Sequence, residues 1–477
     1  MAVATSTIIL TIALYVALLF VVAWRSSRHS DNATFFTGRR STPRLVAMVA
    51  MVGAAMSGVT YISVPGTVAT DGFSYLQTCL GFFVGYAIIA FVLIPLYYRL
   101  GVVSLYEYLD HRFGITAHRT GAWLFFVAKI ASASLRAYVV CVVLQSLLYD
   151  VWGVPFWVNA AIMMTLVWLY TRRGGVRSVV WVEMLKTIIM VASIVLCILF
   201  VIRALGLDFG GAITLVADGD YSRIFFFDDP LDGRYFWKQF IAGIFLVVAM
   251  TGLDQDMMQT MLSCRTERDA KRGMMSSIVV QIVVIALFLS LGVLLYAYAA
   301  KHSLTDAGDN LFGAVATHSD MPAIVGVMFL LGLIASTYSS AGSALTALTT
   351  SFTLDILKGD RNDEHKRKLS HTLIAVAITA IILLFERFSS AGAITLIFTM
   401  ASYTYGPLLG LFAFGILSRR MPRKWSIVAA ALLSPLFCYM LSTHSEAWFA
   451  GYRFSYELLI INAAITLLIL YAFSRKK

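Results

Sequence analysis

The residues best suited to chemistry lie in the stretch GAAMSGVTYISVPG, at positions 53–66. This stretch belongs to an apolar run that starts near Leu45 and is long enough to cross a bilayer. It is nevertheless rich in residues that weaken a helix: Gly53, Ser57, Gly58, Thr60, Ser63, Pro65 and Gly66. In lipid, a helix break is tolerated only where it lines a protein cavity, and its unwound carbonyls can hold a cation. The sequence therefore predicts a broken membrane helix with a binding site, or alternatively a proline-kinked helix whose small residues allow close packing.

A second polar feature lies in the apolar stretch 333–356, where four serines share one helical face. Ser336, Ser339, Ser340 and Ser343 follow the spacing i, i+3, i+4 and i+7. Hard cations such as sodium prefer oxygen ligands, and neutral oxygens bind them weakly enough to release them. A sodium site is one interpretation. The other is that the hydroxyls bond back to carbonyls of their own helix or lie at helix contacts.

Three charged residues fall inside apolar segments, where an ionisable group is costly and usually marks a pathway. Arg136 has no acid nearby on its own helix, so it either pairs across helices or awaits an anionic ligand such as a carboxylate. Glu183 and Lys186 stand at i, i+3 and can pair with each other. An ammonium beside a cation site would repel or replace the cation.

These residues are carried by a chain that composition places in a membrane. Of its 477 residues, 59% are hydrophobic and 13% are charged. We expect an all-α polytopic membrane protein with about thirteen transmembrane helices. The predicted spans are roughly 5–24, 45–68, 75–98, 120–149, 154–170, 178–204, 236–257, 275–299, 321–356, 369–386, 390–417, 424–442 and 454–473.

The net charge of +11 is explained by topology and not by nucleic-acid binding. With these spans, the loops alternate between rich and poor in Lys and Arg. The positive-inside rule then places the amino terminus outside and the carboxyl terminus in the cytoplasm. We expect a multi-pass protein of a cell membrane, such as a bacterial inner membrane.

The order of the spans also predicts an internal symmetry. Five spans in residues 45–204 and five in 236–418 cross in opposite senses, which is the pattern of two inverted repeats with broken first helices. A leading helix and cytoplasmic loop occupy residues 1–44, and an outer loop occupies 205–235. Two peripheral helices and a tail occupy 419–477.

Several motifs, taken in order, resemble the sodium:solute symporter family. They are FFTGRR (35–40), SLYEYLDHRFG (104–114), YTRRGGVRSVVWVEMLK (170–186), TGLDQDMMQTMLSCRTERDAKRG (251–273), SSAGSALT with TLDI (339–356) and YGPLLGLFAFGIL (405–417). The resemblance covers nearly the whole chain and implies the leucine-transporter-type fold. It also implies a sodium site formed by the carbonyls of Gly53 and Met56, the hydroxyls of Ser339 and Ser340, and an oxygen of Ser336.

The resemblance is nearest, in site residues, to the sialic acid transporters of the family. Arg136 matches the arginine that holds the substrate carboxylate there, Ser57 and Thr60 match its hydroxyl partners, and Gln77 could reach the polar tail. Sugar-binding members carry an amide at the position of Thr60 and an acid at that of Cys79, so a neutral hexose is disfavoured.

A second sodium site, found in some relatives, is altered in this sequence. Those relatives have an aspartate where Glu183 stands, facing the hydroxyl stripe near Ser343. Here the acid is longer, Gly342 lacks a hydroxyl, and Lys186 adds a positive charge that could replace the cation. We expect one essential sodium.

The sequence therefore predicts a sodium-coupled symporter that imports a small anionic organic solute, first of all a sialic acid-like sugar acid. A monocarboxylate or vitamin-like acid is the alternative substrate, followed by a neutral sugar. A channel or a substrate-sensing receptor is the rival class. No hydrolase or phosphate-binding motif is present, so we expect no enzyme activity. The expected partners are sodium, the solute and the bilayer, with no nucleic acid, and we expect a monomer.

Overall fold

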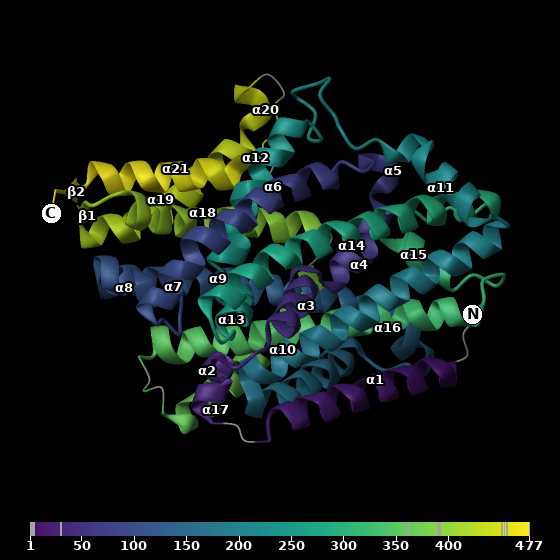
Figure 1. Cartoon of the computed structure of the whole chain (residues 1–477), viewed down its shortest axis with the longest axis horizontal. Helices are drawn as coiled ribbons and strands as arrows, with labels where there is room; N and C mark the ends of the chain where they lie inside the picture. The colour runs from purple at the N-terminus through teal and green to yellow at the C-terminus, as the bar shows by residue number, and fades with distance from the viewer. Residues whose placement is uncertain are drawn as a thin grey trace.

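The computed structural model describes residues 5–28, 31–358, 360, 362–388, 393–449, 452, 454 and 457–476. Helices dominate these residues, and the long ones run roughly along the long axis of the molecule (Figure 1). Among the described residues, eight helices are long and apolar enough to cross a membrane, or up to ten when each bent pair counts as one span. The predicted all-α membrane fold is confirmed.

The first half of the chain contains the predicted broken helix. Helices α3 and α4 form one span bent by 60°. The long helix α10 contains Gly175 with φ 49° and ψ −128°, so it consists of two segments, 156–174 and 176–205, which match two predicted spans. The helices of this half are α3 (Arg44–Ala55), α4 (Gly58–Gly66), α5 (Val68–Asp71), α6 (Tyr75–Ile88), α7 (Ile94–Leu100), α8 (Glu107–Phe113), α9 (Ile115–Leu144) and α10 (Phe156–Leu205).

The second half also begins with a broken helix, as the inverted symmetry predicts. The span 236–252 and the helix after it bend by 70°. The breaks in the two halves are followed by capped helices, with Ser57 capping α4 and Asp254 capping α13. The helices of this half are α12 (Phe236–Val247), α13 (Gln255–Leu262), α14 (Glu267–Lys301), α15 (Leu311–Ala316), α16 (Ala323–Ser351), α17 (Glu364–Phe388) and α18 (Ala393–Leu417). The repeat boundaries themselves stay a prediction.

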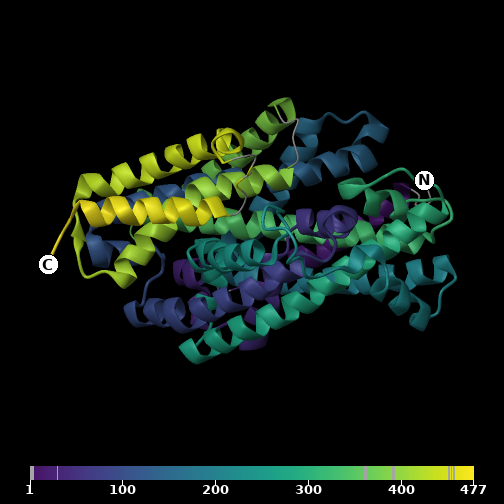
Figure 2. The ribbon, with the colours of Figure 1, turned by 90° about the horizontal axis from the view of Figure 1, so that it is seen from above.

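The other elements lie at the periphery. Helix α1 packs against α10 and α16, and helices α18, α19 and α21 pack together on another side of the molecule, as Figure 2 shows from above. Helix α1 begins and α21 ends at opposite ends of the molecule (Figure 1). These elements are α1 (Thr5–Ser26), α2 (Asn32–Thr37), α11 (Phe209–Ala217), α19 (Lys424–Thr443), α20 (Ser445–Trp448), α21 (Glu457–Ala472), β1 (Met421–Pro422) and β2 (Ser474–Arg475).

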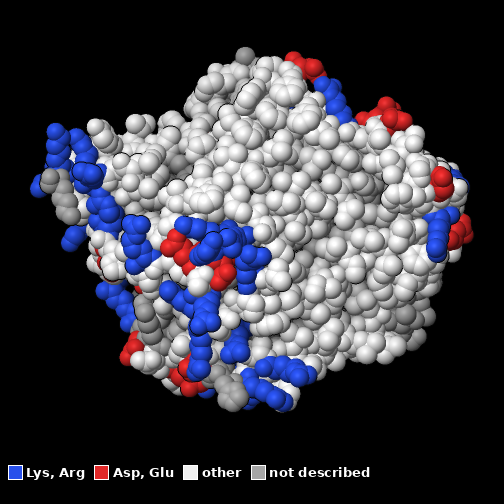
Figure 3. Space-filling view, viewed as in Figure 1, with Lys and Arg blue, Asp and Glu red and all other residues white. Residues whose placement is uncertain are grey.

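Surface charge is distributed unevenly along the long axis. On the face in Figure 3, Lys and Arg gather toward the end where α21 terminates, and a broad uncharged surface lies beside them. An uncharged surface of this kind suits contact with lipid, and basic residues at one end are what the positive-inside rule expects of a cytoplasmic side. The orientation of the termini stays a prediction.

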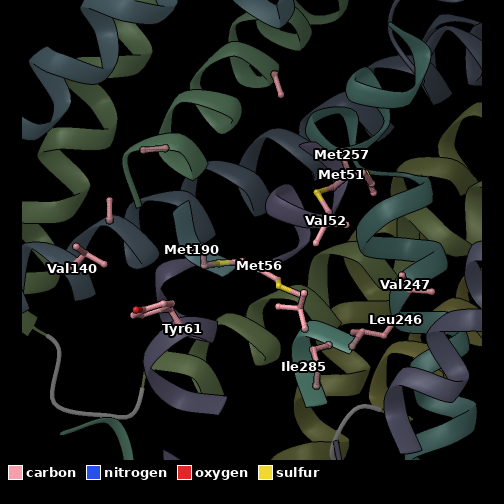
Figure 4. Close-up of a cluster of buried hydrophobic side chains, with 14 of the residues drawn as sticks. Met51, Val52, Met56, Tyr61, Val140, Met190, Leu246, Val247, Met257 and Ile285 are labelled. Carbon is pink, nitrogen blue, oxygen red and sulfur yellow. The ribbon is translucent and has the colours of Figure 1, made fainter. Parts of the chain in front are cut away.

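The broken helix lies in the centre of the buried core. Met51, Val52, Met56 and Tyr61 are all buried there. Figure 4 shows Met56 beside Met190 of α10, with Ile285 of α14 close by. The break is therefore enclosed by apolar side chains, and its polar groups must be satisfied by a few specific partners.

Gly53 allows α3 to approach α10 closely. A Cβ atom at Gly53 would lie 2.1 Å from Thr187 Oγ1 and 3.0 Å from the Glu183 carbonyl oxygen. Thr187 Oγ1 is itself held by hydrogen bonds to the carbonyls of Val49 and Glu183, so it cannot move away without cost.

We expect Gly53→Ala to lower the free energy of unfolding by about 1–3 kcal/mol, because it overpacks this contact. The matched control is Gly313→Ala, where the added Cβ would lie 3.6 Å from its nearest neighbour, Phe329. Thermal unfolding in detergent measures both variants, and adding Thr187→Ala should restore part of the loss. Equal melting temperatures for the two single variants would contradict the assignment.

Candidate functional site

The break between α3 and α4 places two predicted substrate residues together. Ser57 caps α4, and its Oγ accepts a hydrogen bond from the Thr60 backbone N–H at 3.4 Å. Thr60 Oγ1 in turn accepts the Ser57 N–H at 3.3 Å. This reciprocal capping box fixes both side chains at the start of the helix. Both residues line a cavity of about 300 Å³.

The cavity runs between the two broken helices and α9. It is lined by residues of α4, α6, α9, α12 and α14 and by Asp254 and Tyr405. Apolar side chains such as Phe82 and Leu246 alternate with polar ones such as Thr78 and Gln239. Its size and mixed lining are typical of a site for a small organic molecule.

Arg136 of α9 lines this cavity, as the sequence predicts for a ligand contact. The side chain is partly buried. Within the described residues its guanidinium makes no hydrogen bond and no ion pair, so no cross-helix partner satisfies it there. A partly buried cation without a partner can accept an anion at little cost, and its planar fork suits a carboxylate.

A buried cluster of three charges, which the sequence reasoning did not identify, lies next to Arg136. Lys129 Nζ lies 2.7 Å from Asp256 Oδ2 and 3.1 Å from Asp254 Oδ2. Tyr405 donates to Asp254 Oδ2 at 2.5 Å, and Ser343 donates to Asp256 Oδ2 at 3.3 Å. One lysine thus pairs with two carboxylates, and Arg136 lines the same two cavities as Lys129.

A smaller cavity of about 20 Å³ adjoins these groups and shares Ser57, Lys129 and Arg136 with the larger one. Ser340 and Ser343 also line it. This is room for one water molecule or a similarly small polar group. The guanidinium of Arg136 and several hydroxyls line it, so one oxygen of an anionic group can be held here.

Gln77 does not line either cavity in the described part of the chain. Its amide nitrogen donates to the Arg234 carbonyl at 2.8 Å, and its oxygen accepts the Phe226 N–H at 3.0 Å. The side chain therefore holds the segment 223–236 against α6. Gln239, 3.2 Å from the Gln77 nitrogen, lines the cavity instead. Its position on the facing helix α12 gave no signal in the sequence.

Two of the residues predicted to bind sodium, Gly53 and Ser340, meet around the side chain of Lys186. Lys186 Nζ donates to the Gly53 carbonyl at 2.7 Å and to Ser340 Oγ at 3.0 Å. The Gly53 carbonyl also accepts the Met56 N–H at 3.0 Å. The structure thus brings together Gly53 and Ser340 as predicted, with an ammonium between them.

The remaining members of the serine stripe are mostly bonded to their own helix. Ser336 donates to the Leu333 carbonyl at 2.8 Å, and Ser340 to the Ser336 carbonyl at 2.8 Å. Ser339 Oγ is buried beside the Glu183 carboxylate and makes no hydrogen bond among the described residues. Back-bonding of this kind is the alternative that the sequence left open for these hydroxyls.

The two residues of the predicted second cation site, Glu183 and Ser343, contact different charged residues. Glu183 pairs with Lys186 at 3.1 Å, and both side chains are fully buried. Ser343 donates to the Ser340 carbonyl at 3.0 Å and to Asp256, and within the described residues it makes no hydrogen bond to Glu183. Asp256 therefore takes the place beside Ser343 that the sequence assigned to Glu183.

The comparisons with known proteins agree with this architecture. A sequence model described as the sodium:solute symporter family matches residues 35–432. The human sodium/iodide cotransporter is 25% identical over 404 residues, which are 80% of this chain and 60% of that protein. Human sodium-coupled monocarboxylate transporter 1 is 27% identical over 398 residues, 80% of this chain and 63% of that protein. The chain thus spans less than two thirds of the length of these relatives.

Solved structures also resemble this chain over nearly its whole length. One of them is a sodium-coupled sialic acid symporter in a substrate-bound outward-open state, with a TM-score of 0.82 and 18% identity, and the match covers 99% of both chains. At this identity the likeness establishes the fold, which is the fold that the resemblance in the sequence implied.

Proposed function

This chain belongs to the sodium:solute symporter family, and we propose that it imports a small organic anion into the cell together with sodium. The observation that carries the proposal is the guanidinium of Arg136, which faces the central cavity without a partner among the described residues. Ser57 and Thr60 stand at the same cavity. A family of transporters also makes the chain a carrier and not an enzyme.

The anion we propose is a carboxylate with a polar body. Its carboxylate would lie where the two cavities meet, between Arg136 and Ser57, and its body would lie in the larger cavity. Polar side chains along the larger cavity, among them Thr60, Thr78 and Gln239, suit the hydroxyls of a sialic acid-like sugar acid. A short monocarboxylate is the second candidate, because the same arginine would hold it and a relative is named for that substrate.

The buried charges explain why a cation would accompany the anion. Around the cavities, the three cations Arg136, Lys129 and Lys186 balance the three carboxylates Asp254, Asp256 and Glu183. A bound monoanion would leave an excess negative charge in a medium of low dielectric constant. One sodium ion entering with it restores neutrality.

This balance sets the energetics of transport. A tenfold sodium gradient supplies about 1.4 kcal/mol. One sodium with one monoanion moves no net charge, so the membrane potential adds nothing to the driving force. One chain supplies all the residues, and we propose that it works as a monomer in a cell membrane, such as a bacterial inner membrane, with its carboxyl terminus in the cytoplasm.

We expect uptake of a labelled sugar acid into proteoliposomes to require an inward sodium gradient and to be unchanged by a potassium diffusion potential. Potassium or choline in place of sodium serves as the control. Uptake that follows the potential would contradict the one-to-one stoichiometry, and equal uptake in choline would contradict sodium coupling. Counterflow of labelled solute against unlabelled solute separates this carrier from a channel, which shows none.

A further inference from the structure

We propose that the ammonium of Lys186 is the permanent cation of the helix break, so that sodium does not bind between Gly53 and Ser340 in this protein. The sequence and the family resemblance both place a sodium ion at this position. The inference goes beyond the proposed function, because it concerns which group links the broken helix to its neighbours. It does not depend on the identity of the solute.

The first support is the set of partners around the ammonium. Lys186 Nζ donates hydrogen bonds to the Gly53 carbonyl at 2.7 Å and to Ser340 Oγ at 3.0 Å. Glu183 Oε2 lies 3.1 Å from Nζ and forms an ion pair with it. The partners come from α3, α16 and α10 itself, and the Lys186 side chain is fully buried. This geometry indicates that the ammonium is fixed at this position.

The second support is that the acceptors are already used. The Gly53 carbonyl accepts both Lys186 Nζ and the Met56 N–H, which occupy its two lone pairs. The Ser340 hydroxyl accepts from Lys186 and donates to the Ser336 carbonyl. A sodium ion at this place would have to displace Nζ, and two cations this close repel each other strongly in a buried site.

The third support is that Lys186 has its own counter-charge and no open path away from it. Glu183, one helical turn earlier, is fully buried and pairs with it. The segment 176–205 packs against α3 closely enough that a Cβ at Gly53 would lie 2.1 Å from Thr187 Oγ1 and 3.1 Å from Glu183 Oε2. The Glu183 and Lys186 pair is therefore neutral and confined.

A covalently tethered cation changes what the break can do. A bound sodium can leave during the transport cycle, and the contact between α3 and α16 then loosens. Lys186 stays on α10 and keeps α3, α10 and α16 joined whether or not sodium is present. The sodium of the proposed function therefore binds outside this break.

The test removes the Lys186 side chain by mutation and measures whether sodium then binds in its place. In Lys186→Ala, the Gly53 carbonyl, Ser340 Oγ, Ser339 Oγ and the Glu183 carboxylate together form a vacated oxygen site of the kind sodium prefers. Thermal unfolding of the purified full-length protein is followed over a range of NaCl concentrations, with KCl keeping the ionic strength constant. The apparent sodium affinity follows from the rise in melting temperature.

We expect the apparent sodium affinity of Lys186→Ala to exceed that of the wild type by at least about tenfold. The wild type sets the reference for any sodium bound elsewhere. The double variant Lys186→Ala, Ser340→Ala should lose most of this gain. A sodium response of Lys186→Ala equal to that of the wild type would overturn the proposal.

If Lys186→Ala does not fold, a second pair of variants tests the same proposal. Lys186→Ala with Glu183→Gln removes both charges and still frees the Gly53 and Ser340 oxygens, so it should respond to sodium more than Glu183→Gln alone. If these two variants responded equally to sodium, the proposal that Lys186 is the permanent cation of the break would also be refuted. Sodium-independent uptake by the wild type would refute the sodium coupling of the proposed function and leave this inference standing.

Discussion

Replacing Arg136 by alanine should weaken binding of the transported anion by about 10- to 150-fold, because hydrogen bonds to a charged group are worth about 1.5–3 kcal/mol. Arg136 lines both cavities and has no competing partner among the described residues. Its loss therefore removes a contact to the ligand and leaves no other group unpaired. Binding is measured as the shift in melting temperature with the best sugar acid from a ligand screen, in the presence of sodium.

The control for this variant lies one turn away on the same helix. Ser132 lines both cavities, and its hydroxyl donates to the Lys129 carbonyl, so Ser132→Ala removes a wall residue with little loss of charge or fold. We expect it to bind the anion within a few-fold of the wild type. Arg136→Lys should recover part of the affinity, since a point charge replaces a planar fork. Unchanged anion binding in Arg136→Ala would remove the basis of the carboxylate assignment.

The second large effect is expected on stability. Lys129→Met should lower the free energy of unfolding by about 3–5 kcal/mol, because it leaves two buried carboxylates without their cation. Lys129 and Asp254 are each less than a tenth exposed, and so is Asp256. Asp254 keeps Tyr405 and two backbone N–H donors, whereas Asp256 keeps only Ser343. The loss is read from thermal or denaturant unfolding in detergent.

The charge explanation is checked by rescue. Adding Asp256→Asn to Lys129→Met should restore much of the stability, because it removes the carboxylate that has the fewest other partners. As a surface control, Lys271→Met breaks the exposed pair with Glu267 and should cost less than about 1 kcal/mol. If Lys129→Met and Lys271→Met unfold alike, the buried cluster is not held by charge pairing.

The two broken helices could be predicted because their cause is local. Gly, Ser and Pro in the stretch 53–66 weaken an otherwise apolar span, and the break falls at Met56 and Ser57. Arg136 was identified because a charge in an apolar helix with no acid nearby on that helix has few explanations. Both signals are properties of neighbouring residues, and a sequence records them directly.

The arrangement around Lys129 and Lys186 could not be predicted in the same way. Lys129 and Asp256 are far apart in the chain, and Asp256 lies near the end of its predicted span. Their contact depends on how α9 packs against α13. The pairing of Lys186 with Glu183 follows from helical spacing, but its bond to the Gly53 carbonyl depends on the approach of α10 to α3. The contacts of Gln77 could not be predicted for the same reason, since its partners lie on the segment 223–236 and on α12.

Helices α4 and α13 have different N-cap residues, so the electrostatic potential differs between the two sides of the cavity. The amino-terminal end of a helix carries a partial positive charge from its unpaired N–H groups. At α13 the carboxylate of Asp254 neutralises this charge, whereas at α4 the uncharged hydroxyl of Ser57 leaves it in place. The two half-helices therefore present unequal dipole ends to the same cavity. An anion entering between them is drawn toward α4, on the side where Arg136 and Thr60 also line the wall.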